Sequence, residues 1–318
     1  MTAESKLGCR ANYFWSMNSP IVECRSISKK YGEIPALVNF DIDISAGEVF
    51  GMIGPDGAGK TTLFRILSTL ILPDSGRAMV LGHDVVKDYR YIRKSIGFMP
   101  GRFSLYQDLT VEENLKFYAS VFGVKIRDNY HLIKDIYSPL EPFRSRRAGK
   151  LSGGMKQKLA LSCALIHKPM LLILDEPTTG VDAVSRKEFW DHLGTLQTDG
   201  MTILVSTPYM DEAQRCGRLA MVQKGHLLDI GKPDEIRSRF NGTLFQLTSS
   251  DRYQALLICR NSKQISSVHA FGQTLHLTLA DGVQTEFVEN LLIDQGIVEV
   301  VIHEIPPSIE DCFMQYLT

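Results

Sequence analysis

Short apolar runs alternate with helical spacing over roughly residues 21–240. The runs "EVFGMIG" (48–54), "MLLILDE" (170–176) and "MTILVST" (201–207) are nearly continuous, as is typical of strands covered on both faces. "SIGFMP" (95–100) predicts a further strand, and "GKTTLFRILSTLI" (59–71) predicts a helix directly after the first run. This alternation predicts an α/β domain over residues 21–241, built on a parallel sheet.

A helical segment interrupts the strands of this domain between about residues 103 and 149. Within it, "TVEENLKFYASVFG" has the spacing of an amphipathic helix. Thr110 is expected to be its N-cap, and Glu113, three residues later, completes a capping box. We interpret the segment as an inserted helical subdomain.

The pattern changes near residue 242 and predicts a smaller second domain over residues 242–318. Its runs follow the order β-α-β-β-α-β, with two strands joined around Gly272 and a last helix in "PSIEDCFMQYL" that begins at the proline. This order is that of a ferredoxin-like α+β fold. The segment contains no group of residues that suggests catalysis, so we expect a docking or regulatory accessory domain.

Composition narrows the class of protein. The 318 residues carry a formal net charge of −1, which argues against bulk binding of nucleic acid. No apolar run approaches the ~18 residues needed to cross a bilayer. Residues 1–20 lack periodicity and are expected to be a loose tail, with Met17 an alternative start. The cysteines are scattered without a C-x-x-C pair, which fits a reducing cytoplasm.

The clearest chemical signal is "GPDGAGKTT", residues 54–62, which matches the phosphate-loop pattern G-x-x-x-x-G-K-[ST] between a predicted strand and helix. A chance glycine-rich turn is the alternative, and the strand–helix context argues against it. Lys60 is expected to reach the β- and γ-phosphates, and Thr61 to place its hydroxyl on Mg²⁺. The residues expected to bind the nucleotide here are Gly54, Asp56, Gly57, Ala58, Gly59, Lys60, Thr61 and Thr62.

Two acidic residues follow the buried strand at 170–174. Asp175 is expected to hold Mg²⁺ through water, and Glu176 to orient and deprotonate the attacking water. Acidic residues commonly end strands, so this pair alone is a weak signal. Downstream of a phosphate loop it becomes a strong one.

A third motif, "LSGGMKQKLALSCALI", lies directly before that strand. Ser152 is expected to cap a helix whose first turn contains Gly153 and Gly154, which would present backbone N–H groups to an anion. A close packing contact is the alternative interpretation of these small residues. With this motif in place, residues 21–232 resemble the ATP-binding cassette (ABC) ATPases, and the likeness extends to subunits of bacterial type-2 exporters of the drug- and polyketide-efflux group.

The resemblance implies a head-to-tail pair of cassettes. Each ATP would lie between the phosphate loop of one cassette and the signature motif of its partner, which in this chain is "LSGG" (151–154). It implies that Ser152, Gly153 and Gly154 touch the partner's ATP, while Met155 replaces the glutamine often found there. It also implies that Tyr31 stacks on adenine and that Asp182, in "TTGVDAVSR", lies in the loop that crosses the dimer seam. An ordinary core or turn tyrosine is the alternative at Tyr31.

Two positions depart from the pattern of that family. Gly101, in "MPGRF", stands where the family has a glutamine that contacts Mg²⁺ and water. Pro208, in "STPYMDEA", stands where the family usually has a histidine that binds the γ-phosphate. Locally, Thr207 is expected to cap a helix with Pro208 at its first position. Arg102 beside Gly101 is weighed as a catalytic substitute and disfavoured, because surface arginines are common.

The resulting hypothesis is an ATP-hydrolysing subunit of an exporter that binds ATP and Mg²⁺ and drives a separate membrane permease. Its own site is expected to be weakened, which favours pairing with a competent second cassette over a homodimer. It is expected at the cytoplasmic side of the membrane, or in the cytoplasm when free, with no nucleic-acid partner. The alternatives are a nucleotide-binding switch without turnover and a soluble ABC protein acting away from membranes; the transported substrate is not specified.

Overall fold

A computed structural model describes residues 20–317 of the chain. The predicted N-terminal tail, except Pro20, and the alternative start at Met17 therefore lie outside the described residues. The chain divides into two compact units. Of the described residues, one unit contains 20–50, Pro55–Ser206 and Gln223–His226, and the other contains Gly51–Gly54, Thr207–Val222 and 227–317. The domain boundary that the sequence places at 241/242 stays a prediction.

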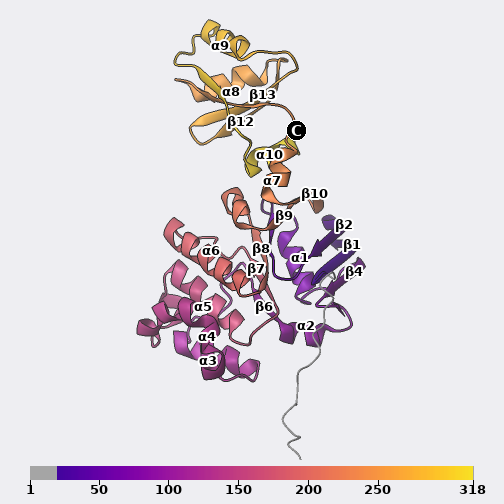
Figure 1. Cartoon of the computed structure of the whole chain (residues 1–318), viewed down its shortest axis with the longest axis vertical. Coiled ribbons are helices and arrows are strands. Elements are labelled where there is room, and N and C mark those ends of the chain that lie inside the picture. Colours follow the sequence, from indigo (N-terminus) through magenta and orange to yellow (C-terminus); the bar gives the residue numbers. More distant parts are fainter. Residues whose placement is uncertain (1–19, 318) are drawn as a thin grey trace, which may run out of the picture. The chain divides into compact units, whose positions relative to one another are not determined.

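The first strands form an antiparallel sheet that the sequence analysis did not anticipate. Its strand order is β2-β1-β4-β5, with β1 (Val22–Tyr31), β2 (Ile34–Ile44), β4 (Ser75–Val80) and β5 (His83–Asp84). Strand β2 buries Phe40, Ile42 and Ile44 at alternate positions. Such alternation is typical of a strand with one covered face, unlike the continuous apolar runs of the parallel strands. Figure 1 shows β1, β2 and β4 side by side.

The α/β core is built on a second sheet, with strand order β10-β9-β3-β8-β7-β6. Strands β6 (Ile96–Met99), β7 (Leu171–Asp175) and β8 (Thr202–Thr207) pair in parallel, as the sequence predicts. Every residue of β3 (Val49–Ile53), β7 and β8 is buried, which explains their continuous apolar runs. The remaining strands are β9 (Arg218–Gln223) and β10 (His226–Gly231), and the helices are α1 (Lys60–Leu67), α2 (Tyr89–Ser95) and α6 (Ala183–Thr198).

The segment between β6 and β7 is helical, as predicted. It contains α3 (Val111–Val121), α4 (Ile126–Tyr137), the 3-10 turns η1 (Ser138–Phe143) and η2 (Ala148–Lys150), and then α5 (Gly153–Leu165). Figure 1 shows α3, α4 and α5 together. The capping box at the start of α3 is confirmed, because Glu113 N–H donates to Thr110 Oγ1 at 3.2 Å and Thr110 N–H donates to Glu113 Oε2 at 2.8 Å.

The C-terminal strands and helices follow the predicted order. They are β11 (Leu244–Thr248), α8 (Arg252–Arg260), β12 (Ile265–Phe271), β13 (Thr274–Leu279), α9 (Thr285–Asp294), β14 (Val301–Glu304) and α10 (Ile309–Gln315), preceded by η3 (Met210–Arg215) and α7 (Pro233–Ser238). The sheet is antiparallel throughout, in the order β12-β13-β11-β14. The prediction that the last helix begins at a proline is wrong: Ser308 is its N-cap, and Asp311 completes a capping box.

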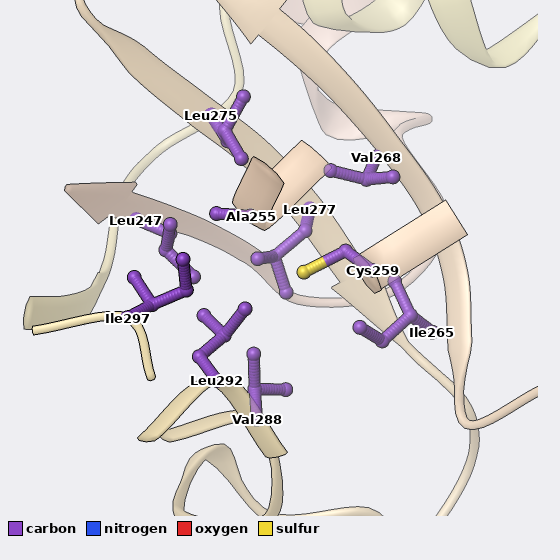
Figure 2. Close-up of a cluster of buried hydrophobic side chains, with 10 residues drawn as sticks. All are labelled: Leu247, Ala255, Cys259, Ile265, Val268, Leu275, Leu277, Val288, Leu292 and Ile297. Atoms are coloured by element: carbon purple, nitrogen blue, oxygen red, sulfur yellow. The ribbon is translucent and has the colours of Figure 1, made fainter. Parts of the chain in front are cut away.

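The C-terminal sheet and its two helices enclose an apolar core (Figure 2). Strands β11 and β13, together with α8 and α9, contribute most of its side chains: Leu247, Ala255, Cys259, Leu275, Leu277, Val288 and Leu292. All of these are fully buried. Alternate residues of β13 supply the core, which is why "TLHLTL" reads as a strand with one buried face.

We expect Leu277→Ala to destabilise this core by about 2–5 kcal/mol, because it removes buried methyl groups and leaves a cavity. Faster hydrogen–deuterium exchange of the β11 and β13 amides would report the loss locally. The control is Tyr253→Ala in the same part of the chain, since that side chain is 65% exposed. Equal protection of these strands in both variants would show that the cluster does not stabilise them.

No helix among residues 20–317 combines the length and apolar character that spanning a membrane requires.

Candidate nucleotide-binding site

The predicted phosphate loop leads from β3 into α1, which begins at Lys60. Gly59 precedes the helix with φ of 112°, a left-handed conformation that side chains rarely adopt. A Cβ at this position would lie 2.4 Å from the carbonyl oxygen of Ala36, so only glycine fits. The backbone geometry of the loop therefore requires glycine at position 59, directly before the lysine of the motif, independently of any ligand.

Lys60 is the central cation of the site and is only 3% exposed. Its Nζ donates to the carbonyl oxygen of Pro55 at 3.0 Å, across the loop. It also lies 3.3 Å from Glu176 Oε1, so the predicted phosphate ligand and the predicted base are neighbours. The first turn of α1 contains no acidic residue, which leaves the positive end of the helix dipole uncompensated there.

Thr61 and Asp175, which the sequence analysis assigns to a magnesium site, contact each other. Thr61 Oγ1 donates to Asp175 Oδ1 at 3.1 Å. Ser206 Oγ donates to the same oxygen at 2.6 Å, which orients the carboxylate. Hydroxyl and carboxylate oxygens are the ligands that Mg²⁺ prefers, so the donor set fits that ion. Among the residues the structure describes, no cluster of three or more His, Cys, Asp or Glu could hold a metal ion.

Ser206 is a site residue that the sequence analysis missed. It pairs with Asp175 in the parallel register of β7 and β8, and it accepts the N–H of Glu176 on its Oγ at 2.9 Å. The sequence contained a signal for it, namely a serine near the carboxyl end of the strand that follows the carboxylate strand. The carboxyl ends of neighbouring parallel strands meet at one sheet edge, where such sites form.

Glu176 adopts a left-handed backbone conformation, with φ of 48°. Such a conformation costs a non-glycine residue on the order of 1–3 kcal/mol and is typical of functional sites. Both Ser206 O and Ser206 Oγ accept its N–H, at 3.1 and 2.9 Å, and so hold this turn. Thr179 Oγ1 lies 3.4 Å from its carboxylate. The backbone therefore aims Glu176 toward Lys60 rather than along the direction of the strand.

The signature motif forms the predicted capped helix start. Ser152 is the N-cap of α5 and accepts the N–H of Met155 on its Oγ at 3.4 Å. A Cβ on Gly154 would lie 2.5 Å from Ser185 Oγ, so close packing against α6 also requires this glycine. Asp182 is the N-cap of α6 and accepts the N–H of Ser185 at 3.0 Å. That hydrogen bond lowers the pKa of Asp182. The structure thus brings the signature and the Asp182 loop together through Ser185.

Tyr31 ends β1 beside a tight turn and is 46% exposed. Ile34, its partner in the hairpin, is also exposed. The exposure of Tyr31 argues against a core tyrosine, whereas an ordinary turn tyrosine stays the alternative to the predicted stacking on adenine. The stacking itself stays a prediction.

Gly101 lies against Asp175, the carboxylate that is predicted to hold Mg²⁺. A Cβ there would be 3.1 Å from the carbonyl oxygen and 3.7 Å from Oδ2 of Asp175. A side chain at this position would start beside Asp175, and glycine offers neither donor nor acceptor.

Pro208 follows β8 but does not begin a helix, which corrects the sequence prediction. The 3-10 turn η3 starts at Met210 with Tyr209 as its N-cap. Thr207 Oγ1 accepts the N–H of Tyr209 at 3.0 Å and donates to Glu212 Oε2 at 2.6 Å. Thr207 therefore stabilises the bend after the strand, and Pro208 supplies no donor to any ligand.

These elements are those of an ATP-binding cassette, and comparison with known proteins agrees. The ABC transporter family model matches residues 37–179. The chain is 34% identical over 303 residues to the Nod factor export ATP-binding protein I of Rhizobium sp. (strain N33), which covers 94% of this chain and 97% of that protein. The chain therefore belongs to the ABC transporter family, as an ATP-binding cassette.

A second relative is the probable multidrug ABC transporter ATP-binding protein YbhF of Escherichia coli K12, which is 39% identical over 308 residues. The match covers 95% of this chain and 53% of YbhF, so the chain spans about half the length of that relative. Among solved structures, cbiO1 from Clostridium perfringens superposes with a TM-score of 0.62 at 25% identity, covering 70% of this chain and 92% of that chain.

The dimeric cassette MJ0796 bound to ADP and Pi gives a TM-score of 0.61 at 26% identity, covering 66% of this chain and 98% of that chain. These matches confirm the predicted P-loop α/β fold of the ABC type. The individual site assignments stay predictions.

Proposed function

We propose that this chain is the ATP-binding subunit of an ABC exporter. It binds Mg-ATP at its own phosphate loop and completes a second nucleotide site on a partner cassette with its signature motif. The export assignment is supported by the names of the relatives, which describe multidrug and Nod factor export. The observation that carries the nucleotide site is the convergence of Lys60, Thr61, Asp175 and Glu176 through direct contacts.

At its own site, Lys60 binds the β- and γ-phosphates, and Thr61 and Asp175 hold Mg²⁺. The bound ion supplies charge neutralisation of the phosphates. Glu176 accepts the proton of the attacking water. Lys60 must exchange its contact with Glu176 for the phosphate, which frees that carboxylate for water.

ATP hydrolysis at the site built on this chain's own phosphate loop is slow, because two side chains that would position the attacking water and the γ-phosphate are absent. A side chain at position 101 would begin beside Asp175, but Gly101 carries none. Pro208 likewise provides no hydrogen-bond donor after β8. Loss of one such donor costs on the order of 10²–10³ in rate. ATP binding is therefore expected to be intact, because the residues that bind the phosphates are all present. ATP hydrolysis is expected to be slow, because the side chains that position the attacking water and the γ-phosphate are missing.

An intact signature beside a weakened catalytic site favours an asymmetric pair of cassettes. Ser152, Gly153 and Gly154 keep the capped helix start that the partner's ATP requires. The multidrug relative extends beyond the aligned region by nearly the same length again, which leaves room for a second cassette in that protein. We infer a heterodimeric pair on the cytoplasmic face of a membrane permease, with a homodimer as the alternative.

Restoring the two missing groups tests the weakened-site proposal. We expect Gly101→Gln combined with Pro208→His to raise the ATPase rate at the site built on this chain's own phosphate loop by ~10²-fold. The backbone at Gly101 is not left-handed, and the new Cβ needs only a few tenths of an ångström of adjustment. Turnover is measured with the partner's site inactivated. Gly101→Ala with Pro208→Ala is the matched control and should leave the rate low; no gain in the Gln/His variant would favour a switch without turnover.

A further inference from the structure

Ser206 contacts both acidic residues of the nucleotide site through one hydroxyl group. Its Oγ donates to Asp175 Oδ1 at 2.6 Å and accepts the N–H of Glu176 at 2.9 Å. Ser206 is fully buried near the carboxyl end of β8. Because buried polar groups are costly to leave without a partner, both hydrogen bonds are expected to persist when a nucleotide binds.

The two carboxylate oxygens of Asp175 have different surroundings. Oδ1 accepts from Ser206 Oγ and from Thr61 Oγ1, the latter at 3.1 Å. A carboxylate oxygen has about two acceptor positions, so these two hydroxyl groups occupy Oδ1. Within residues 20–317, no group donates a hydrogen bond to Oδ2. The hydroxyl of Ser206 therefore helps to determine which oxygen of Asp175 stays available to a further ligand.

Oδ2 is on the side of Asp175 that lies toward Gly101. A Cβ at position 101 would be 3.7 Å from Oδ2, and glycine provides no side chain there. Position 101 therefore supplies neither a donor that could hold Oδ2 nor an oxygen that could bind a cation beside it. The orientation of the carboxylate depends on the two hydroxyl groups at Oδ1.

Removing the hydroxyl of Ser206 would affect Asp175 more than Glu176. The carbonyl oxygen of Ser206 also accepts the N–H of Glu176, at 3.1 Å, and a change of side chain leaves that bond in place. Asp175 Oδ1 has no such substitute, because within residues 20–317 it accepts from no main-chain N–H. An alanine at position 206 thus separates the orientation of the carboxylate from the turn at Glu176.

We propose that Ser206 is a positioning residue that sets the affinity of this site for Mg²⁺. It holds Oδ1 of Asp175, so that Oδ2 accepts from a water bound to the ion, and it compensates for the missing side chain at position 101. This inference rests on the proposed function. Residues that hydrogen-bond to metal ligands typically change metal affinity by about 10–100-fold when they are mutated. Ser206 has that relation to Asp175.

The first test titrates Mg²⁺ into the purified chain in the presence of a fluorescent, slowly hydrolysed ATP analogue, with binding followed by anisotropy. We expect Ser206→Ala to raise the Mg²⁺ concentration for half-maximal binding about tenfold. Affinity for the analogue in EDTA should stay at its wild-type value, because the substitution acts through Asp175 and the ion. A purely structural role of Ser206 would lower both affinities together.

Three further variants separate the hydroxyl group from packing. Ser206→Thr keeps the hydroxyl and should restore the wild-type Mg²⁺ requirement. Ser206→Cys, whose S–H is a weak donor, replaces the alanine variant if a thermal melt shows that alanine does not fold. Thr202→Val is the matched control, because it removes another buried hydroxyl of β8, which accepts the N–H of Gly47 at 2.8 Å.

Three results would overturn the proposal. They are an unchanged Mg²⁺ requirement in Ser206→Ala, an equal loss of affinity in EDTA, and the same shift in Thr202→Val. A threonine variant as impaired as the alanine variant would assign the loss to packing and would overturn it as well.

The second test measures whether Ser206 and position 101 act together. Gly101→Gln introduces a side chain that starts beside Asp175 and ends in an amide oxygen. With this change present, Ser206→Ala should raise the Mg²⁺ requirement less than about threefold. Additive effects of the two substitutions would contradict the compensation and with it the proposal. If the wild type does not bind the analogue with Mg²⁺, the proposed function fails, whereas wild-type binding with no effect of Ser206→Ala refutes only the role of Ser206.

Discussion

Ser152→Arg is expected to remove nearly all ATP hydrolysis from an assembly of this chain, its partner cassette and a permease, by ~10²-fold or more. Ser152 caps α5, and its Oγ is the acceptor for Met155 N–H. Arginine cannot cap the helix in this way, and it places bulk and a long side chain where the partner's ATP must approach. If the partner's site performs most of the turnover, this single change acts on the productive site.

Glu176→Gln in the same assembly is expected to cost less than about tenfold. Glu176 serves the site built on Lys60, and that site already lacks side chains at Gly101 and Pro208. Effects within one catalytic unit are not additive, so removing the base from an impaired site adds little. The glutamine keeps the size of the side chain, although the strained turn at this position stays in place.

Steady-state ATPase activity of the reconstituted assembly, with one change at a time, decides the order of the two effects. The isolated chain should turn over slowly or undetectably. Glu176→Gln silencing the assembly as completely as Ser152→Arg would contradict the asymmetric pairing. A homodimer with a competent site of unusual composition would then be the better description.

Lys60→Ala is expected to weaken Mg-ATP binding by at least ~10²-fold, because it removes the cation that donates to the carbonyl oxygen of Pro55 across the phosphate loop. The substitution also leaves Glu176 without its lysine partner, and repulsion between that carboxylate and the phosphates adds to the loss. Isothermal titration with a slowly hydrolysed ATP analogue and Mg²⁺ measures the effect directly.

Pro208→Ala is the control for that titration and should change affinity little, since neither residue has a side chain that can bind phosphate. A thermal melt of each variant separates lost binding from lost folding, because Lys60 is buried. Comparable losses of affinity in both variants would refute the role assigned to Lys60.

The sequence by itself determined the local features of the site. The order of strand, glycine loop and helix placed Lys60 and Thr61 at the start of α1. Capping residues identified the starts of α3 and α5, because the side chain that satisfies a free N–H lies within three residues of it. Continuous apolar runs identified β3, β7 and β8, since burial on both faces leaves no polar alternation.

Only the tertiary structure decided which distant residues meet. Ser206 lies 31 residues from Asp175 and reaches it because parallel pairing sets the register of β7 and β8. The left-handed turn of Glu176 and the close approach of Gly101 to Asp175 likewise depend on neighbouring strands. Pro208 appeared suited to begin a helix, but the hydrogen bonds of Thr207 to Tyr209 and Glu212 stabilise a bend instead. These hydrogen bonds join residues two and five positions apart, so this bend is a local feature that the helix prediction overlooked.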